Sequence, residues 1–368
     1  MKTPPFRLLH VFPSFAMGGQ QRRLASLVAG FGDEFQHKVL SLDGDCAAAA
    51  LLDPARASVE TFAFRKSALV SPANIVSLSR ELRAFRPDVL CTYNWGSLEA
   101  ALSNRLGPGI PHVHHEDGFG PDELDREQKV RRILARRRLL SRSFVTVPST
   151  GLLRIARDVW RLDPARLSRQ PVGIDLARFQ APARDYARAP VTVAAIGALR
   201  REKNFARLIG AFEKAAATSP ARLVIHGDGP EADALRGRVA GSPLADRISL
   251  AGQTFAPQAA LVEADIFALS SDTEQTPISL IEAMASGLPA VATDVGDIRA
   301  MVSAANAAFI AAKGDDEAYV AALAALIEDK DLRERLGHAN AKKSVEFDEG
   351  VMIANFAALY RRAASRAQ

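Results

Sequence analysis

A chain of 368 residues, 48% of them hydrophobic, is long enough for about two domains of ordinary size, each with its own core. No apolar run approaches the roughly 18 residues that cross a membrane, and the N-terminal segment, interrupted by Arg7 and His10, is too short for a signal peptide. Two cysteines exclude a disulfide framework and a zinc-type spacing, so we expect a cytoplasmic protein. The net charge of +5 lies mainly in residues 1–180, which favours an anionic partner or surface for that half.

Strands and helices are expected to alternate through this first half. Strand-like runs occupy residues 8–12, 37–42, 59–64, 89–93, 110–115 and 144–147. Helical patterns occupy residues 73–85 and 94–106, the second with Asn94 as a candidate N-cap. This alternation predicts parallel βαβ units.

A glycine pair, Gly18–Gly19, follows the first strand and precedes a helix with Leu24, Leu27 and Val28 on its apolar face. Glycines at such a point let the backbone approach a ligand where side chains would collide. The alternative is an ordinary turn.

A polar cluster ends the fifth strand: His112, His114, His115, Glu116 and Asp117. Alternation along a strand would place these side chains on two faces, and no HExxH or comparable spacing is present. We therefore predict no metal site in this cluster.

The most basic stretch, residues 126–142, contains one acid, Glu127, and the cations Arg126, Lys129, Arg131, Arg132, Arg136, Arg137, Arg138 and Arg142. Its apolar residues Val130, Ile133, Leu134 and Leu140 are expected on one side of a helix. Such a helix suits an anionic membrane surface, where each cation contributes about 1 kcal/mol. Packing of the apolar stripe on the sheet is the alternative, and the lack of interleaved aromatic residues argues against nucleic acid.

Residues 180–190 are rich in Pro, Ala and Arg and are predicted to be a linker. A second alternation follows, with strands expected at 191–196, 222–226, 247–252, 265–269 and 291–293, Ala-rich helices over 307–336 and a terminal helix over 350–363. We therefore predict domains over residues 1–180 and 181–349.

The stretch EQTPISLIEAMASGLPAVATDVGD starts at Glu274 and reads as loop, helix, turn and strand. Pro277 suits a first helical turn, and Gly287 followed by Pro289 ends the helix. Glu282 falls on the helix face of Ile278 and Ser279. The first turn would therefore offer free N–H groups and a positive dipole end to an anion, beside two carboxylates that accept hydrogen bonds. A phosphate joined to polyhydroxyl groups fits that arrangement.

The E-x7-E spacing followed by AMASGLPAVATDVG resembles the signature of the family 4 retaining glycosyltransferases (glycosyl transferases group 1). The resemblance covers nearly the whole chain and is strongest over residues 191–300. It implies the GT-B fold, an α/β architecture of two Rossmann-like parallel-sheet domains facing a central cleft. The N-terminal domain would be the acceptor side and residues 181–349 the nucleotide-sugar donor domain, with helix 350–368 crossing back to the first domain.

The resemblance also implies site residues. Arg200 and Lys203, with Arg201 as the alternative to Arg200, would hold the donor diphosphate, although Ala198 stands where the family has arginine. Glu274 would hold the hydroxyls of the transferred sugar. The remaining donor-binding positions are Gly18, Gly19, His115 or Asp117, Gly227, Gly252, Gln253, Thr276, Pro277, Ile278, Ser279, Leu280 and Glu282, the last for the ribose diol.

The implied reaction is metal-independent transfer of a hexose-type sugar, with retention, from a UDP-sugar or GDP-sugar to a glycan or lipid-linked acceptor. A bacterial surface polysaccharide or glycolipid is the expected product, made in the cytoplasm or at the inner face of the plasma membrane. No separate cofactor is expected. The alternative is a non-catalytic sugar-nucleotide-binding protein, and Ala198 is the residue in its favour. A nicotinamide-dependent enzyme is disfavoured because neither half opens with G-x-G-x-x-G.

Overall fold

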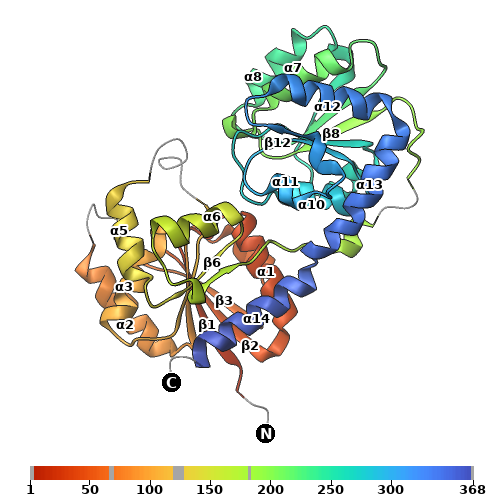
Figure 1. Cartoon of the computed structure of the whole chain (residues 1–368). Coiled ribbons are helices and arrows are strands. Elements are labelled where there is room, and N and C mark those ends of the chain that lie inside the picture. Colours follow the sequence, from red (N-terminus) through yellow and green to blue (C-terminus); the bar gives the residue numbers. More distant parts are fainter. Residues whose placement is uncertain (1–3, 66–69, 119–127, 181–183, 366–368) are drawn as a thin grey trace. The chain divides into compact units, whose positions relative to one another are not determined.

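The computed structural model describes residues 4–65, 70–118, 128–180 and 184–365, and the chain divides into two compact units (Figure 1). The first unit comprises Met1–Gly173 and Gly350–Gln368, and the second comprises Ile174–Glu349. We had expected the boundary after residue 180. The change of unit lies earlier in the chain because Ile174 and Phe179 are buried in the core of the second unit.

The first unit is built on a seven-stranded sheet in the order β3-β2-β1-β4-β5-β6-β7, in which every pair is parallel. Its strands are β1 (Phe6–Phe12), β2 (Phe35–Ser41), β3 (Ala57–Thr61), β4 (Val89–Tyr93), β5 (His112–His115), β6 (Phe144–Val147) and β7 (Leu167–Arg169). Its α-helices in the described residues are α1 (Gly19–Phe31), α2 (Pro72–Phe85), α3 (Leu98–Leu106), α5 (Val130–Leu139), α6 (Thr150–Arg154) and α14 (Glu349–Ser365).

Alternating residues of β1 divide the core of this unit into two layers. Leu8 and Phe12 pack with α1 and α14, whereas Leu9 and Val11 pack with α2. Figure 1 shows α1 and α14 on one side of the sheet and α2 and α3 on the other. Helix α14 is therefore part of the first unit's core, although the whole second unit separates it in sequence from the rest of that unit.

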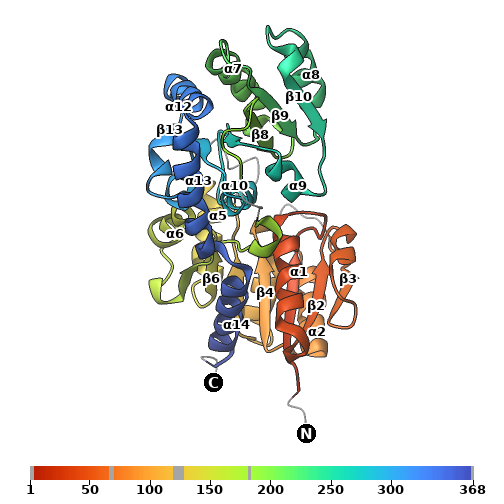
Figure 2. The same cartoon turned by 90° about the vertical axis from the view of Figure 1, so that its right-hand side faces the viewer.

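The second unit has a six-stranded parallel sheet in the order β10-β9-β8-β11-β12-β13. Its strands are β8 (Thr192–Ile196), β9 (Arg222–His226), β10 (Ile248–Gly252), β11 (Ile266–Leu269), β12 (Ala290–Asp294) and β13 (Ile310–Ala312). Its helices are α7 (Phe205–Ala215), α8 (Ala232–Ala240), α9 (Pro257–Val262), α10 (Ile278–Ala285), α11 (Ile298–Met301), α12 (Asp316–Glu328) and α13 (Lys330–Ser344), most of which are labelled in Figure 2. The predicted pair of Rossmann-like parallel sheets is confirmed.

The segment that we predicted to be a linker packs instead on the second unit, as far as its described residues show. Arg184 donates to the backbone carbonyls of Leu261 and Ser286 at 3.0 Å, and buried Tyr186 donates to the carbonyl of Gly287 at 3.1 Å. Burial of the arginine stem and tyrosine ring, together with these hydrogen bonds, fixes the segment despite its turn-like composition. Residues 181–183 of the predicted linker lie outside the described residues.

No helix of the described ranges has both the length and the hydropathy that crossing a bilayer requires.

Candidate active site

The carboxyl ends of the parallel strands β8 to β12 meet at one edge of the second sheet, so the loops that follow them lie together. Ligands of doubly wound sheets bind at this edge. The sequence assigned its donor-binding residues of the second domain to these loops and to the start of α10. The structure therefore brings those residues to one edge of one sheet.

Lys203 and Glu274 form the central contact of this edge. The Lys203 ammonium is ion-paired with Oε1 of Glu274, and the Ser271 hydroxyl donates to the same oxygen at 2.7 Å. The two charged side chains are 25% and 10% exposed, so both remain open to a ligand while most of their surface is covered. A lysine assigned to phosphate and a glutamate assigned to sugar hydroxyls thus lie side by side.

A network of hydrogen bonds fixes the turn of Lys203 against the loop of Glu274. Asp272 N donates to the Glu202 carbonyl at 2.8 Å, and the Ser270 hydroxyl donates to the Lys203 carbonyl at 2.9 Å. Arg207, one turn into α7, bridges the Asp272 carboxylate at 2.7 Å and the Ser270 carbonyl at 2.9 Å. The position of Lys203 relative to Glu274 is therefore set by backbone and buried polar contacts.

Sequence reasoning missed this network. Asn204, which adopts a left-handed backbone conformation with φ 46°, caps α7 and also donates to Asp272 at 3.1 Å. The available signal was the pair of polar residues, Asn204 and Arg207, directly after the predicted basic turn. Neither has an obvious partner nearby in sequence, since Asp272 is far along the chain.

Two glycine turns at the same edge pack backbone against backbone. A β-carbon added at Gly227 would lie 1.9 Å from the carbonyl oxygen of Gly197, so no larger residue fits without a shift. Gly227 N also donates to the Gly252 carbonyl at 2.8 Å, which joins the turns after β9 and β10. Gly252 has φ 75°, and both it and Gln253 are exposed at the edge. Gly227 thus has a packing role that suffices to explain a glycine there.

The start of α10 differs in one detail from the prediction. Pro277 is the N-cap rather than a residue of the first turn, and Leu280 N already donates to the Pro277 carbonyl at 3.2 Å. Among the described residues, this leaves the N–H groups of Ile278 and Ser279 as the open donors of the first turn. Glu282 shares their half-buried face, as predicted, while Leu280 and Ile281 are buried on the opposite side. Thr276, just before the cap, is half-buried.

Arg200 and Arg201 are both exposed in the turn after β8, as is Ala198. The Arg200 side chain is available at the same edge as Lys203, and its backbone N–H donates to the Ala198 carbonyl at 2.8 Å. The choice between the two arginines for the diphosphate stays a prediction.

In the first unit, the glycine pair and Asp117 meet at the carboxyl edge of the sheet. Gly18 is the N-cap of α1 and Gly19 its first residue. Gln20 and Arg23, on the same helix, donate to the Asp117 carboxylate, Arg23 through two bonds of 2.5 and 2.8 Å. Although burial disfavours its charge, the attraction of Asp117 raises the pKa of Arg23 above its ordinary value. The sequence analysis did not identify Arg23. The available signal was its position four residues before Leu27, which places it on the apolar face of the helix.

His115, the alternative to Asp117, lies inside the unit. Its ring stacks on Tyr93 at 4.6 Å between centroids, and its two nitrogens form hydrogen bonds with the hydroxyls of Thr146 at 3.0 Å and Tyr360 at 3.3 Å. Burial lowers the pKa of His115 well below its ordinary value, with the charge of Arg23 acting in the same direction. Its polar atoms are thus used by the core, as the carboxylate of Asp117 is by Gln20 and Arg23, and the choice between the two for contact with a ligand stays a prediction.

Asn94 is the N-cap residue of a short 3-10 helix, Trp95–Ser97, rather than of α3, and its side chain makes no capping bond. It adopts φ 52°, and its side-chain oxygen accepts a hydrogen bond from Asp117 N at 2.9 Å, while helix α3 starts after Ser97. The requirement for this bond outweighs the local preference of asparagine for a cap.

The predicted basic helix forms, but one of its cations points inward. Arg136 is fully buried and donates to Glu116 through bonds of 2.9 and 3.3 Å, with its guanidinium 5.1 Å from the Trp95 ring and 4.8 Å from the Trp160 ring. Burial opposes ionisation of Glu116, but the hydrogen bond from His114 and the charge of Arg136 lower its pKa below the ordinary value. Arg136 is therefore a structural residue and not a surface cation.

The apolar residues of this helix are also divided. Val130 and Leu134 are 71% and 45% exposed, whereas Leu140 is buried. The prediction of a single apolar stripe is thus wrong, because Arg136 is buried in this helix while Val130 and Leu134 are exposed. Arg126 and Glu127 of the predicted stretch lie outside the described residues.

The polar cluster at the end of β5 serves the core. Thr92 Oγ1 lies 2.8 Å from His112 and 2.7 Å from His114, and Ser143 Oγ lies 2.7 Å from the other nitrogen of His112. Throughout the described ranges, no three His, Cys, Asp or Glu side chains are grouped so as to hold a metal ion.

Two family models match the chain. The model described as Glycosyl transferases group 1 matches residues 185–343, and the model described as Glycosyltransferase Family 4 matches residues 17–178. The chain belongs to the family 4 glycosyltransferases. The predicted family is thereby confirmed.

This glycosyltransferase is similar to N-acetyl-alpha-D-glucosaminyl L-malate synthase of Bacillus anthracis, with 26% identity over 45% of the chain and 44% of the relative. It is also similar to the amylovoran biosynthesis glycosyltransferase AmsK of Erwinia amylovora, with 29% identity over 52% of the chain and 50% of the relative. The matched region thus spans about half the length of each of these relatives.

Solved structures share the fold over almost the whole chain. Anabaena HepE in complex with UDP has a TM-score of 0.80 at 19% identity, and the alignment covers 96% of this chain and 98% of HepE. Sucrose-phosphate synthase from Thermosynechococcus elongatus has a TM-score of 0.79 at 17% identity, with 98% and 100% covered. The GT-B fold is therefore established for this glycosyltransferase.

Proposed function

We propose that this protein transfers a hexose-type sugar from a nucleotide diphosphate sugar to a glycan or lipid-linked acceptor, with retention and without a metal ion. The observation that carries the proposal is the ion pair between Lys203 and Glu274 at the carboxyl edge of the second sheet. It supports the proposal because a cation suited to a diphosphate lies beside a hydrogen-bond acceptor suited to sugar hydroxyls.

Breaking the bond between the anomeric carbon and the diphosphate oxygen leaves negative charge on the diphosphate. Preorganised positive groups at that point are usually the largest source of catalysis. Lys203, exposed Arg200 and the N–H groups of Ile278 and Ser279 would supply them here. The network through Asp272 and Arg207 holds Lys203 in place before the donor binds, so little reorganisation is needed.

The two glutamates would orient the donor from opposite ends. Glu274 would accept hydrogen bonds from the transferred sugar while the ammonium of Lys203 turns to the phosphate, and Glu282, on the half-buried face of α10, would accept them from the ribose diol. With the departing phosphate taking the acceptor's proton, attack on the face from which the phosphate leaves would retain the configuration. The carboxylate of Glu274 acts here by orientation and not as a nucleophile.

A uridine donor and a bacterial surface polysaccharide or glycolipid product have support from the relatives. HepE was crystallised with UDP and with UDP-glucose, and AmsK is named for amylovoran biosynthesis. We propose the same classes of donor and product here, with GDP-sugars as the alternative donors.

If the acceptor is a lipid, the protein must reach a membrane surface, and the exposed face of α5 is suited to bind one. Val130, Arg131, Leu134 and Arg138 are all exposed and recur at helical spacing. We propose that this face lies on an anionic membrane surface, the apolar pair entering the interface while the arginines meet lipid phosphates. Changing Arg131 and Arg138 to glutamine should reduce flotation with phosphatidylglycerol vesicles, and the matched loss of Arg80 and Arg83 from α2 should not. Equal flotation of both variants would remove this part of the proposal.

The first experiment is a panel of UDP- and GDP-sugars, read by thermal shift with and without EDTA and then by product formation. One donor should stabilise the protein regardless of EDTA and be turned over. Glu274→Gln should lower transfer by roughly two orders of magnitude or more while donor binding persists. Glu317→Gln, an exposed glutamate on α12, is the matched control and should leave transfer unchanged.

Two outcomes would contradict the assignment. Unchanged turnover of Glu274→Gln would remove the glutamate's role. Donor binding by the unaltered protein without any transfer would support the second candidate, a sugar-nucleotide-binding protein, for which Ala198 in place of the family's arginine is the specific observation.

A further inference from the structure

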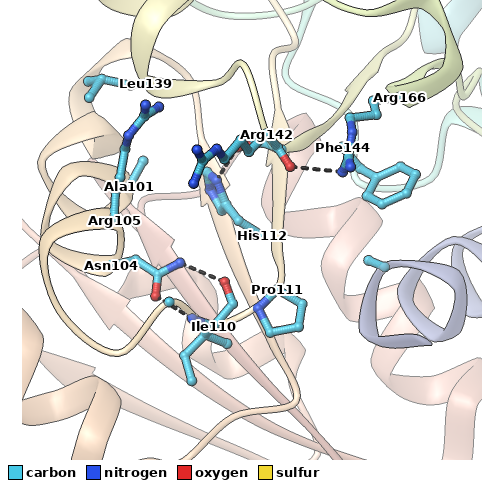
Figure 3. A pocket seen from close by; sticks show the side chains of 13 residues that line it. Ala101, Asn104, Arg105, Ile110, Pro111, His112, Leu139, Arg142, Phe144 and Arg166 are labelled. Atoms are coloured by element: carbon cyan, nitrogen blue, oxygen red, sulfur yellow. Dashed lines mark hydrogen bonds between the residues drawn. The ribbon is translucent and has the colours of Figure 1, made fainter. Parts of the chain in front are cut away.

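The first unit contains a cavity at the edge of its sheet opposite to Asp117. It has a volume of about 450 Å³ and is lined where β5 and β6 begin, by Pro111, His112, Ser143 and Phe144. Residues from the ends of α3, α5 and α14 close it, among them Leu139 and Ala363. Figure 3 shows these side chains around the opening. The volume lies within the range of about 300–1,000 Å³ that is usual for small-molecule sites.

Three arginines line the cavity, Arg105, Arg142 and Arg166, and none of its described lining residues is acidic. Arg105 donates to the Arg138 carbonyl at 2.5 Å and to the Ser141 hydroxyl at 3.2 Å. Arg166 donates to the Arg142 carbonyl at 2.9 Å, stands 5.3 Å from the Phe144 ring and is ion-paired with the Asp163 carboxylate at 3.9 Å. Two of the guanidinium groups are therefore held by the fold before any ligand arrives.

Arg105 and Arg142 are exposed, whereas Arg166 is half-buried. Figure 3 shows the Arg142 guanidinium on the same side of the cavity as that of Arg105, above the ring of His112. Its backbone is fixed by the bond from Arg166, so the side chain moves from an anchored base. An exposed arginine beside fixed arginines is the arrangement in which a bound anion relieves repulsion between like charges.

The floor of the cavity adds no compensating charge. Burial lowers the pKa of His112 to about 3, with His114 acting in the same direction, so the imidazole is neutral at physiological pH. Its two nitrogens are joined to Thr92 and Ser143, and Asn104 is bonded to the backbone of Ile110 on both its amide atoms. Asp163 balances part of the charge of Arg166, so the net positive charge of the cavity comes mainly from Arg105 and Arg142.

We propose that this cavity binds a phosphate group carried by a small polar molecule. Guanidinium groups match the geometry of phosphate oxygens and offer two parallel N–H bonds, which a lysine does not. The space exceeds that of a bare ion, so the phosphate has room for an attached polar group such as glycerol. A phosphorylated solute and the headgroup of an anionic lipid share this chemistry.

The site would be separate from the donor site. Its lining residues surround the amino ends of β5 and β6, whereas Gly18 and Asp117 lie beyond the carboxyl ends of strands in the same sheet. The donor-binding lysine belongs to the second unit. Occupation of the cavity is therefore not expected to require, or to compete with, a nucleotide sugar.

The test is calorimetric titration of the full-length protein with inorganic phosphate and with glycerol 1-phosphate. Lys203→Gln serves as the starting protein, so that phosphate binding at the donor site is weakened. Adding Arg142→Gln should lower the affinity by about tenfold or more, the effect of losing one charged hydrogen-bonding partner. Adding Arg80→Gln, which removes an exposed arginine from α2, is the matched control and should leave the affinity unchanged.

A second arm separates the two sources of phosphate. Flotation with phosphatidylglycerol vesicles is compared for the unaltered protein, Arg142→Gln and Arg80→Gln. Loss of glycerol 1-phosphate binding in Arg142→Gln supports a soluble ligand, and selective loss of vesicle binding in that variant supports a lipid headgroup. If Arg142→Gln matches the control in both arms, or if neither probe binds, the proposal is overturned.

Discussion

Replacement of Arg136 by methionine is expected to weaken the first unit severely, because it leaves the Glu116 carboxylate in the core without its charge partner. The side chains of Arg136 and Glu116 are 1% and 0% exposed, and the pair is joined by two hydrogen bonds. Methionine fills much of the same space but supplies neither the charge nor the donors.

The magnitude follows from the burial of the pair. Removing one member of a buried ion pair costs about 3–5 kcal/mol of unfolding free energy. This loss of unfolding free energy already includes the lost cation–π contacts with Trp95 and Trp160, since a methionine packs against the two rings in place of the guanidinium. With a urea dependence of about 2 kcal/mol per molar, the unfolding midpoint should fall by about 2 M.

The assay can be confined to this unit. The chain has two tryptophans, Trp95 and Trp160, and both belong to the first unit and contact Arg136. Urea unfolding followed by tryptophan fluorescence therefore reports on the first unit. Arg138→Met, an exposed residue of the same helix, is the matched control and should change stability by no more than about 0.5 kcal/mol.

The double variant Glu116→Gln with Arg136→Met keeps the prediction testable if the single variant does not fold. Removing both charges should restore more than half of the lost stability, because the uncompensated carboxylate is then gone. A single variant with the midpoint of Arg138→Met, or a double variant no more stable than the single one, would refute the reasoning.

Three further predictions concern the donor site and the histidines. Lys203→Gln should weaken binding of UDP itself by about tenfold, measured by calorimetry, because a charged hydrogen bond to phosphate is lost. Equal affinity of the variant and the unaltered protein for UDP would argue against contact between Lys203 and the diphosphate. Gly227→Ala should lower the melting temperature by circular dichroism, since its β-carbon would lie 1.9 Å from the Gly197 carbonyl oxygen, whereas Gly237→Ala, with open space in α8, should not. Burial lowers the pKa values of His10 and His37, the latter to about 4, so protonation favours the unfolded chain. Stability should be unaffected by these groups above pH 6.5 and should decline as the pH falls from 6.5 toward 4, by up to about 1.4 kcal/mol per pH unit for each histidine; a flat fluorescence-detected midpoint between pH 7.5 and 5.5 would contradict this.

The hydrophobic periodicity of the sequence predicted correctly which residues of an element are buried where each face of that element has one neighbour. The half-buried face of Ile278, Ser279 and Glu282 follows from helical spacing alone, because α10 packs on the sheet with the opposite side. The two parallel sheets were likewise predicted from a local pattern, the alternation of strands and helices along the sequence.

Partnerships between distant residues were not predictable in this way. Arg136 reads as one cation of a basic surface, and only the fold brings it to Glu116 and to two tryptophans that are far from one another in sequence. Arg184 and Tyr186 likewise read as linker residues, but backbone carbonyls of the second unit accept their hydrogen bonds. Backbone acceptors carry no residue-specific signal.

The donor loop combined both situations. Glu274 and Lys203 were assigned from a motif, but their direct contact depends on Asp272, Asn204 and Arg207, which connect two loops at the ends of neighbouring strands. A sequence pattern records the ligand-facing residues and leaves out those that hold them in place.

The position of α14 has a consequence for how the chain is made. Met352, Phe356 and Tyr360 are buried against the first sheet, and their helix is synthesised after the second unit. Domains generally fold in the order in which they are synthesised, but here the first unit lacks part of its core until the second unit has been synthesised. The second unit is one continuous segment, Ile174–Glu349, and can be complete earlier. A nascent chain that has emerged only as far as residue 349 would thus present a complete second unit and an open apolar face on the first, and α14 then completes the core of the first unit.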